Sequence, residues 1–511
     1  MKRFTLISLF LITGVTVFAQ DKKARRFYDE GMSFYQKKNY SSAINSFSAA
    51  IGRYPSYTEA FLKRGVSYYF LGNNVNALAD FTRTIELDPK NAQAYFYRAE
   101  VENKLGQSKT ALADYSMSIQ YDPRQASSYN NRGTIYLYQG NYAAALSDFR
   151  QAVDISPDDD TLYYNLGLCE YKLLHPDNAA RYLDKAIALD PKNADAYRLR
   201  GDILADEKKY EEAISFYSKA ISIDPKNAFA WNDRGYAYYC LERNEEALSD
   251  YNKAISICQD SARLYNNRGA LYFETEQYEL AIADFNTSIR INPTNYWLFL
   301  EKAIVEVRLE EFEEAYRNIS TCIRLNPSCA PAYRIRGNLR LEIGEDDEEE
   351  IFADYNKSLE LENNPFTYDA RGSAYMEMDE PDSALADFNR AISMDSTQAL
   401  FFVHRAHCYS LLNNSKKMIA DCDKVVALTN NSADSYYLRG RCYASLNKYD
   451  EAIADFTKVT ELEPGNAEAY YQRGTCWYSK LNNAKARLDY QKAIELDPQN
   501  GFYKACLQQV K

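Results

Sequence analysis

Three residues in one short segment have the side chains and spacing of a metal site. His407 and Cys408 follow His404 by three and four residues, so a helix would place all three on one face, and zinc accepts imidazole and thiolate ligands. The alternative is a structural role for the cysteine, as a small side chain that fills buried space. Cysteine occupies the corresponding place without histidine at Cys169, Cys442 and Cys476. We expect no metal and no cofactor, and retain His404, His407 and Cys408 as weak candidates for a metal site.

No arrangement of residues suggests catalysis. The sequence contains no G-x-x-x-x-G-K phosphate loop, no G-x-G-x-x-G turn, no H-E-x-x-H zinc motif and no G-x-S-x-G nucleophile motif. Carboxylates are plentiful, but they recur at fixed intervals along the chain, which is typical of structural or solvated residues. We therefore predict a protein that is not an enzyme.

The fixed intervals come from one unit that repeats along the 511 residues. A small residue recurs every 34 residues from Gly31 to Gly337, once after 35 at Gly372, and every 34 again to Gly474. An aromatic residue lies four residues before each of these fourteen positions, and alanine lies twelve residues after most of them. Each unit has the periodicity of two amphipathic helices, and one such pair cannot bury its own apolar stripe, so neighbouring units must stack.

This pattern resembles the tetratricopeptide repeat, with an aromatic residue at position 4, Gly or Ala at 8, Ala at 20, an aromatic residue at 24 and Pro at 32. Counted from residue 24, fourteen copies cover 24–500, and copy ten carries two extra residues in its inter-helix turn. The resemblance implies an all-α fold: one continuous right-handed superhelical solenoid of antiparallel helix pairs, with a 34-residue period and a concave groove. Residues 501–511 would form a C-terminal capping helix.

The first nineteen residues have the layout of a secretory signal: a basic start, an apolar run over 4–17 and small residues before a cleavage site after Ala19. A short segment, 20–23, would then precede the repeats. The alternative is a membrane anchor, but the run is shorter than the roughly 20 residues that span a bilayer. We expect an exported protein, periplasmic or secreted, with no membrane span in its mature chain. The net charge of −12 disfavours nucleic acid as a partner.

Arginine and aspartate recur together in the repeats. Arginine precedes the small residue in eleven copies and aspartate precedes the second-helix aromatic residue in ten, and the same ten copies carry both. Arg200, opposite Phe216, is the exception. Because pairing between adjacent copies gives more mismatches, we predict an ion pair within each repeat, as between Arg268 and Asp284. Two parallel hydrogen bonds would fix how the two helices sit.

An exported protein with ten cysteines can form disulfides. Cys408, Cys442 and Cys476 occupy equivalent places on successive repeats, about 8–10 Å apart at helix-packing distance, which exceeds the reach of a disulfide. Cys408 and Cys422, on the two helices of one repeat, are the one pairing that we consider.

Positions 2, 5, 6, 9, 12 and 13 of each repeat form the stripe of the first helix that faces away from its partner helix; we call it the first-helix stripe. In tetratricopeptide proteins this stripe lines the concave surface. Here it holds many tyrosines, among them Tyr138, Tyr164 and Tyr236. Tyrosine offers a large contact area with a polar tip, which suits a partner surface. The alternative is that these rings pack against the neighbouring repeat.

Asparagine adds a second feature to this stripe. Tyr-Asn-Asn-Arg-Gly occurs at 129–133 and 265–269, and this resembles the asparagine ladder with which some tetratricopeptide superhelices hold a peptide backbone. A side-chain amide can donate and accept at once, although Leu199 interrupts the ladder. The candidate groove residues are Asn130, Asn131, Tyr164, Asn165, Asn232, Asp233, Tyr236, Asn266 and Asn267. No window supplies the Lys and Asn residues of the two-carboxylate clamp of chaperone-binding members.

These observations predict a non-catalytic interaction scaffold of the cell envelope that binds proteins or extended peptides in a groove lined by Tyr and Asn. Self-association is possible, and nothing in the sequence names the partner. The alternative is a polysaccharide-associated export or assembly scaffold, since Tyr-lined grooves also stack on sugars.

Overall fold

The computed structural model describes residues 22–344 and 347–510, and every regular element in these ranges is a helix. The predicted signal segment, 1–19, lies outside the described residues. The chain divides into two compact units, the first ending at Gln259 and the second beginning at Asp260.

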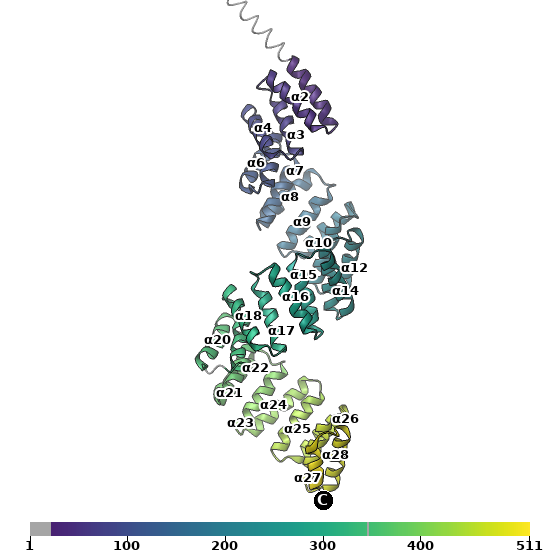
Figure 1. Ribbon diagram of the computed structural model, residues 1–511, viewed down its shortest axis with the longest axis vertical. Coiled ribbons are helices and arrows are strands. Elements are labelled where there is room, and N and C mark those ends of the chain that lie inside the picture. Colours follow the sequence, from purple (N-terminus) through teal and green to yellow (C-terminus); the bar gives the residue numbers. More distant parts are fainter. Residues whose placement is uncertain (1–21, 345–346, 511) are drawn as a thin grey trace, which may run out of the picture. The chain divides into compact units, whose positions relative to one another are not determined.

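The first unit begins with a helix over 22–36. It continues with α2 (Tyr40–Arg53), α3 (Thr58–Phe70), α4 (Asn74–Leu87), α5 (Ala92–Lys104), α6 (Ser108–Tyr121), α7 (Ala126–Tyr138), α8 (Tyr142–Ile155), α9 (Asp160–Lys172), α10 (Pro176–Leu189), α11 (Ala194–Asp206), α12 (Tyr210–Ile223), α13 (Ala228–Cys240) and α14 (Asn244–Ile257). Figure 1 shows these helices lying side by side in chain order.

The second unit has the same construction. It comprises α15 (Ala262–Glu274), α16 (Tyr278–Ile291), α17 (Tyr296–Arg308), α18 (Phe312–Leu325), α19 (Ala330–Glu342), α20 (Glu348–Leu361), α21 (Pro365–Glu377), α22 (Pro381–Met394), α23 (Ala399–Leu411), α24 (Ser415–Leu428), α25 (Ala433–Ser445), α26 (Tyr449–Leu462), α27 (Ala467–Ser479), α28 (Asn483–Leu496) and α29 (Gly501–Gln509).

Within each unit the two helices of a repeat pack most extensively on each other, and the second helix then packs on the first helix of the next repeat. From α3 to α28 the odd-numbered helices have 13 residues and the even-numbered helices 14, as α3 and α4 do. The predicted all-α fold, a solenoid of paired antiparallel helices, is confirmed. None of the helices in the described ranges is both long and apolar enough to cross a membrane.

Local sequence explains where these helices begin and end. In the repeat at 58–91, Gly72 adopts a φ of +73° in the turn between α3 and α4, a backbone conformation that glycine adopts without steric cost. Helix α4 ends at Leu87, shortly before Pro89, and Asn91 then caps α5 by accepting a hydrogen bond from the Ala94 amide at 3.1 Å.

The glycine at position 8 allows the aromatic ring at position 24 to lie against the first helix. A Cβ added at Gly201 would lie 2.6 Å from Cε1 of Tyr217, and one at Gly337 would lie 2.9 Å from Cε1 of Tyr355. Both rings are fully or almost fully buried. A side chain at either glycine would therefore displace a tyrosine whose hydroxyl takes part in the polar clusters described below.

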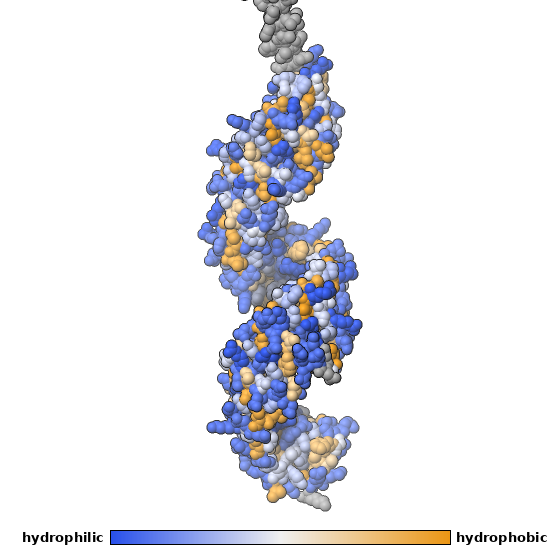
Figure 2. All heavy atoms as spheres, turned by 90° about the vertical axis from the view of Figure 1, so that its left-hand side faces the viewer, coloured by the Kyte–Doolittle hydropathy of each residue, from blue (hydrophilic) through white to orange (hydrophobic). Residues whose placement is uncertain are grey.

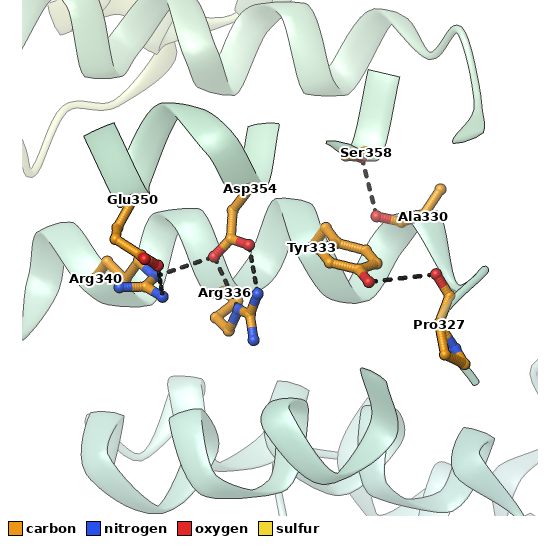
Figure 3. A network of polar contacts seen from close by, with 8 residues as sticks. All are labelled: Pro327, Ala330, Tyr333, Arg336, Arg340, Glu350, Asp354 and Ser358. Carbon is orange, nitrogen blue, oxygen red and sulfur yellow. Dashed lines mark hydrogen bonds and ion pairs between the residues drawn. The ribbon is translucent and has the colours of Figure 1, made fainter. Parts of the chain in front are cut away.

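The predicted ion pair is present in all ten repeats that carry both residues, with two N–H···O distances of 2.5–2.9 Å in each. The aspartates are buried, with 4–7% of their surface exposed. Figure 3 shows the pair between Arg336 and Asp354, where Arg340 also donates to Asp354 at 3.0 Å and to Glu350 at 2.7 Å.

Sequence reasoning missed a third bond made by many of these arginines. The Nη1 atom of Arg132, for example, donates to Ser116 in the second helix of the preceding repeat at 2.9 Å. The exceptional Arg200 turns to that preceding helix altogether, where Asp184 accepts from it at 3.2 Å. The arginine therefore links the two helices of one repeat and also joins that repeat to the one before it.

Candidate binding sites on the first-helix stripe

The structure corrects the candidate metal site. His404 Nδ1 lies 2.9 and 3.0 Å from the two carboxylate oxygens of Asp369, in the preceding repeat. Cys408 is buried and its thiol donates to the backbone oxygen of Pro381 at 3.1 Å, whereas His407 is exposed. In residues 22–344 and 347–510 no group of three or more His, Cys, Asp or Glu side chains could hold a metal ion.

The pairing of Cys408 with Cys422 is also wrong. The Cys422 thiol instead donates to Cys442 of the next repeat, with 3.4 Å between the two sulfur atoms. The reason is that the second helix of a repeat packs on the first helix of the following one. All ten cysteines are free thiols.

The first unit brings three of the predicted asparagines together. Asn165 donates to Asn130 at 2.9 Å, Asn130 donates to Asn131 at 3.1 Å, and Asn131 donates to the carboxylate of Glu100. Tyr115 donates a short hydrogen bond to the same carboxylate oxygen. These amides therefore bind one another and Glu100. Sequence reasoning did not predict that a carboxylate would hold the end of the ladder.

A second polar cluster in the first unit surrounds Arg198. Its Nη1 donates to Asp202 at 3.1 Å and to Asp233 of the next repeat at 3.2 Å, and Tyr217 donates to the other oxygen of Asp202 at 2.9 Å. We call these four residues the paired-arginine cluster. Burial alone would lower the pKa of Arg198, but Asp202 and Asp233 outweigh it and the pKa is raised.

Two candidate groove residues lie buried here: Asp233, a member of the cluster, and Asn232 beside it. Asn232 is fully buried and Asp233 is 4% exposed, and the Asn232 amide donates to Asp233 at 3.1 Å. The interpretation of these two side chains as groove-facing is therefore wrong: they hold the cluster together. The neighbouring Tyr236, by contrast, is 46% exposed.

The tyrosines of the stripe divide in the same way. Tyr138 is 86% exposed. Tyr164 is half-buried, and burial raises the pKa of its hydroxyl. Some tyrosines of the stripe are therefore exposed and available to a partner, as Tyr138 is, and others are partly buried, as Tyr164 is.

Asn266 and Asn267 belong to the second unit, and both are half-buried. The carboxyl of Glu301 accepts from the indole nitrogen of Trp297 at 2.8 Å. Burial raises the pKa of Glu301, and the hydrogen bond from Trp297 opposes that rise.

The second unit also has a hollow that sequence reasoning missed. It has a volume of about 390 Å³ and lies between α17 and α19 on the first-helix stripe. Its walls are mainly apolar, its polar groups are Arg334, Asn338, Arg308 and Glu342, and its apolar lining comprises Ile304, Val307, Phe312, Ile335 and Leu339. We call it the arginine hollow.

Arg334 differs from the other arginines described above. It is half-buried, burial lowers the pKa of its guanidinium, and it forms no ion pair with any carboxylate in the described part of the chain. Tyr355 donates to the amide oxygen of Asn338 at 2.7 Å, so the part of Asn338 that remains to bind a ligand is its N–H donor group.

A further hollow of about 400 Å³ lies on the same stripe three repeats further along, between α23 and α25. His404, His407, Leu438, Arg441 and Cys442 are among its lining residues. Large apolar side chains at position 2 are exposed nearby: Trp297 by 44%, Phe366 by 43% and Leu400 by 52%. On the face seen in Figure 2, hydrophobic side chains gather in small separate groups on a mainly hydrophilic surface.

Stacked helix pairs with polar clusters and hollows on one stripe define an all-α repeat scaffold. Comparison with known families is more specific, because models described as the tetratricopeptide repeat match ten segments of the chain: 28–80, 81–113, 133–173, 170–228, 216–249, 235–275, 262–295, 367–398, 433–466 and 467–500. The chain belongs to the tetratricopeptide repeat family. As a member it is a non-catalytic, protein-binding scaffold, and it has about fourteen helix pairs.

Several solved structures are similar. The hetero-tetramer Cut9–Hcn1 of APC/C is 14% identical over 98% of both chains, with a TM-score of 0.41. YrrB, described as a TPR protein with an unusual peptide-binding site, is 30% identical over 36% of this chain and 95% of its own, with a TM-score of 0.31. A tetratricopeptide repeat protein from Parabacteroides merdae is 19% identical over 48% of this chain and 98% of its own, with a TM-score of 0.42. No curated protein sequence matches the chain significantly.

Proposed function

We propose that this protein is an exported scaffold of the cell envelope, periplasmic or secreted, that binds proteins or extended peptides along its first-helix stripe. The observation that carries the binding proposal is the arginine hollow, which two adjacent repeats line from that stripe. The signal-like layout of residues 1–19 supports the location.

The lining of the hollow suits a peptide. A cavity with apolar walls and a few placed polar groups binds an apolar side chain and orients it through the polar ones. Trp297, on the lining helix α17, and Phe366, in the repeat that follows α19, are exposed aromatic side chains that add apolar surface. An extended chain would place successive side chains on these surfaces.

Site-specific photo-crosslinking in cells tests this proposal. A benzophenone side chain replaces Tyr138 or Trp297 on the stripe and, as the control, Val75, which is 79% exposed on a second helix. We expect light-dependent adducts with other proteins from the two stripe positions and not from Val75. Adducts with the protein itself only, or none, would make a structural spacer the better account.

The location has its own test. Fractionation of the cells followed by N-terminal sequencing should find a mature chain that begins at Gln20 outside the cytoplasm. A chain that retains Met1 in the cytoplasmic fraction would contradict export.

One observation favours a polysaccharide partner as the second candidate. The ring of Tyr138 is 86% exposed and that of Tyr236 is 46% exposed, and such rings also stack on sugars. Two results together would favour this candidate. The protein would bind glycans on an array and lose that binding on Tyr138→Ala and Tyr236→Ala, and it would retain no peptide.

A further inference from the structure

We propose that the arginine hollow binds an acidic side chain, Glu or Asp, from the interior of an extended peptide. This inference rests on the proposed function and names the chemistry of the partner. It comes from a comparison of two equivalent sites in the same chain, one complete and one lacking its carboxylates.

The two sites share their framework. Arg198 and Arg334 both occupy position 5 of their repeats, and Tyr217 and Tyr355 are the corresponding second-helix aromatic residues. The hydroxyl of each tyrosine donates a hydrogen bond to the residue at position 9 of its own repeat. Tyr217 donates to Asp202 at 2.9 Å, and Tyr355 donates to Asn338 at 2.7 Å.

The carboxylates differ. Arg198 pairs with Asp202 at position 9 and with Asp233 at position 6 of the next repeat. Asn338 and Ala370 occupy the corresponding positions around Arg334. Both anionic partners are thus replaced by neutral residues, while the cation is kept and remains half-buried.

The walls differ in the same sense. In the first unit, the hydroxyl of Tyr171, at position 12 of the preceding repeat, donates a hydrogen bond to Asp206 at 2.8 Å. Its counterpart in the second unit is Val307, which lines the hollow with Ile304 and Ile335. Apolar walls exclude water from part of the guanidinium, so a carboxylate that enters gains a stronger hydrogen bond there than at an open surface.

Two polar residues of the lining, the half-buried Arg334 and the exposed Asn338, offer hydrogen-bond donors to the hollow. Arg334 has only N–H groups, and the oxygen of Asn338 is occupied by Tyr355, which leaves the amide N–H group. A carboxylate accepts hydrogen bonds and pairs with guanidinium through two parallel bonds. Glu342 and Arg308, the two exposed charges of the lining, have opposite signs. The Glu362 carboxylate acts on Arg334 from a distance without forming an ion pair, and burial still lowers the pKa of Arg334.

The surroundings favour an acidic residue within a peptide over the end of one. Trp297 and Phe366 are exposed at position 2 of the repeats on either side of Arg334. A ligand that contacts both rings must reach from α17 to α21, so it continues beyond the repeat of Arg334 toward both neighbouring repeats. The carboxylate at the hollow then comes from a side chain.

The test is fluorescence anisotropy with the full chain and a pair of probes. Both are fluorescein-labelled nonapeptides with blocked ends and Leu and Val residues around one central residue, which is Glu in the first probe and Gln in the second. We expect the Glu probe to bind the protein about tenfold or more tightly than the Gln probe, because hydrogen bonds to a charged group are the stronger ones.

Three variants assign the preference to the hollow. Arg334→Met removes the cation, and Ala370→Asp restores an internal carboxylate at the position that Asp233 occupies in the first unit. Ala370→Asn is the matched neutral control. The preference for Glu should vanish in the first two variants and persist in the third. Circular dichroism melting curves show whether each variant is folded.

The outcomes separate the inference from the function on which it rests. Equal binding of the two probes, or a preference that survives Arg334→Met, overturns the inference and leaves the scaffold function standing. Tighter binding of a Gln probe with a free C-terminal carboxylate overturns it as well. If neither probe binds, the inference is wrong, and the absence of cross-links from Tyr138 and Trp297 would then show that the proposed function fails too.

Discussion

Arg198 in the first unit and Arg334 in the second occupy the same position of the repeat in opposite electrostatic surroundings. Two carboxylates raise the pKa of Arg198, whereas burial lowers that of Arg334. Their repeats have the same helix lengths and the same tyrosine behind the arginine. The comparison teaches that the repeat determines where the arginine at position 5 lies. Position 9 of the same repeat and position 6 of the next determine whether the protein itself supplies carboxylates that neutralise its charge.

The largest predicted effect concerns the framework that both units share. Asp148→Ala in the first unit and Asp284→Ala in the second should each destabilise their own repeat by about 3–5 kcal/mol, because each leaves a largely buried arginine side chain, 19% exposed, without its carboxylate. Hydrogen exchange of the amides of the affected repeat, measured by mass spectrometry on the full chain, reports this local free energy.

The exposed pair of Arg200 with Asp184 is the control for that measurement. Asp184→Ala should cost about 1 kcal/mol of stability or less, since exposed ion pairs contribute little.

A double-mutant cycle tests the intra-repeat ion pair directly. Strict additivity of the stability losses of Arg268→Ala and Asp284→Ala would contradict it.

The next prediction applies one substitution to both members of the comparison. Arg198→Met should destabilise its region by about 3 kcal/mol, because Asp202 and Asp233 lose their cation. Arg334→Met should cause no loss and up to about 1 kcal/mol of gain, because a half-buried cation without an ion pair is replaced by an apolar side chain.

Hydrogen exchange in α11–α13 and in α19–α21 compares the two changes within one protein. A loss of local stability of similar size in both regions would contradict the comparison, since it would mean that Arg334 has a stabilising partner. A loss of stability confined to α11–α13 would support it.

The smallest predicted effect comes from supplying the missing carboxylate. Ala370→Asp should stabilise the region of α19–α21 by about 0.5–1 kcal/mol through an ion pair with Arg334, and the gain should shrink at high salt. Ala370 packs against the buried cluster of Ile351, Tyr355 and Ala374, so the neutral Ala370→Asn controls for the added volume. Equal effects of Asp and Asn on local exchange would contradict an electrostatic origin.

Much of the fold could be predicted because its determinants are periodic. The ion pairs recur at one spacing in ten repeats, so the matches and mismatches of Arg and Asp along the chain were enough to choose partners within a repeat. The turn at Gly72 and the cap at Asn91 follow from the conformational preferences of single residues.

The site was harder to predict because it depends on which unlike residues meet across repeats. The asparagine ladder was predicted as a ligand grip, but Glu100 from the preceding repeat accepts from Asn131. Asn232 was assigned to the groove on its position alone, although the side chain is buried against Asp233. Likewise, Cys422 meets Cys442 because helix packing continues into the next repeat.

One available signal was overlooked. Arg334 and Arg198 are the two arginines at position 5, and the sequence already shows Asp at both companion positions in one case and neither in the other. A comparison of positions 9 and 6 between consecutive repeats would have drawn attention to Arg334. What it could not have shown is the apolar wall of Ile304 and Val307 beside that charge.

The most direct test of this account is a double-mutant cycle between Arg334 and the central residue of the peptide probe. Isothermal titration calorimetry of wild-type protein and Arg334→Met, each with the Glu and the Gln probe, yields one coupling free energy. We predict a coupling of about 1.5–3 kcal/mol, as for a hydrogen bond between charged groups. A coupling within about 0.5 kcal/mol of zero would show that the carboxylate does not meet Arg334 and would contradict the account.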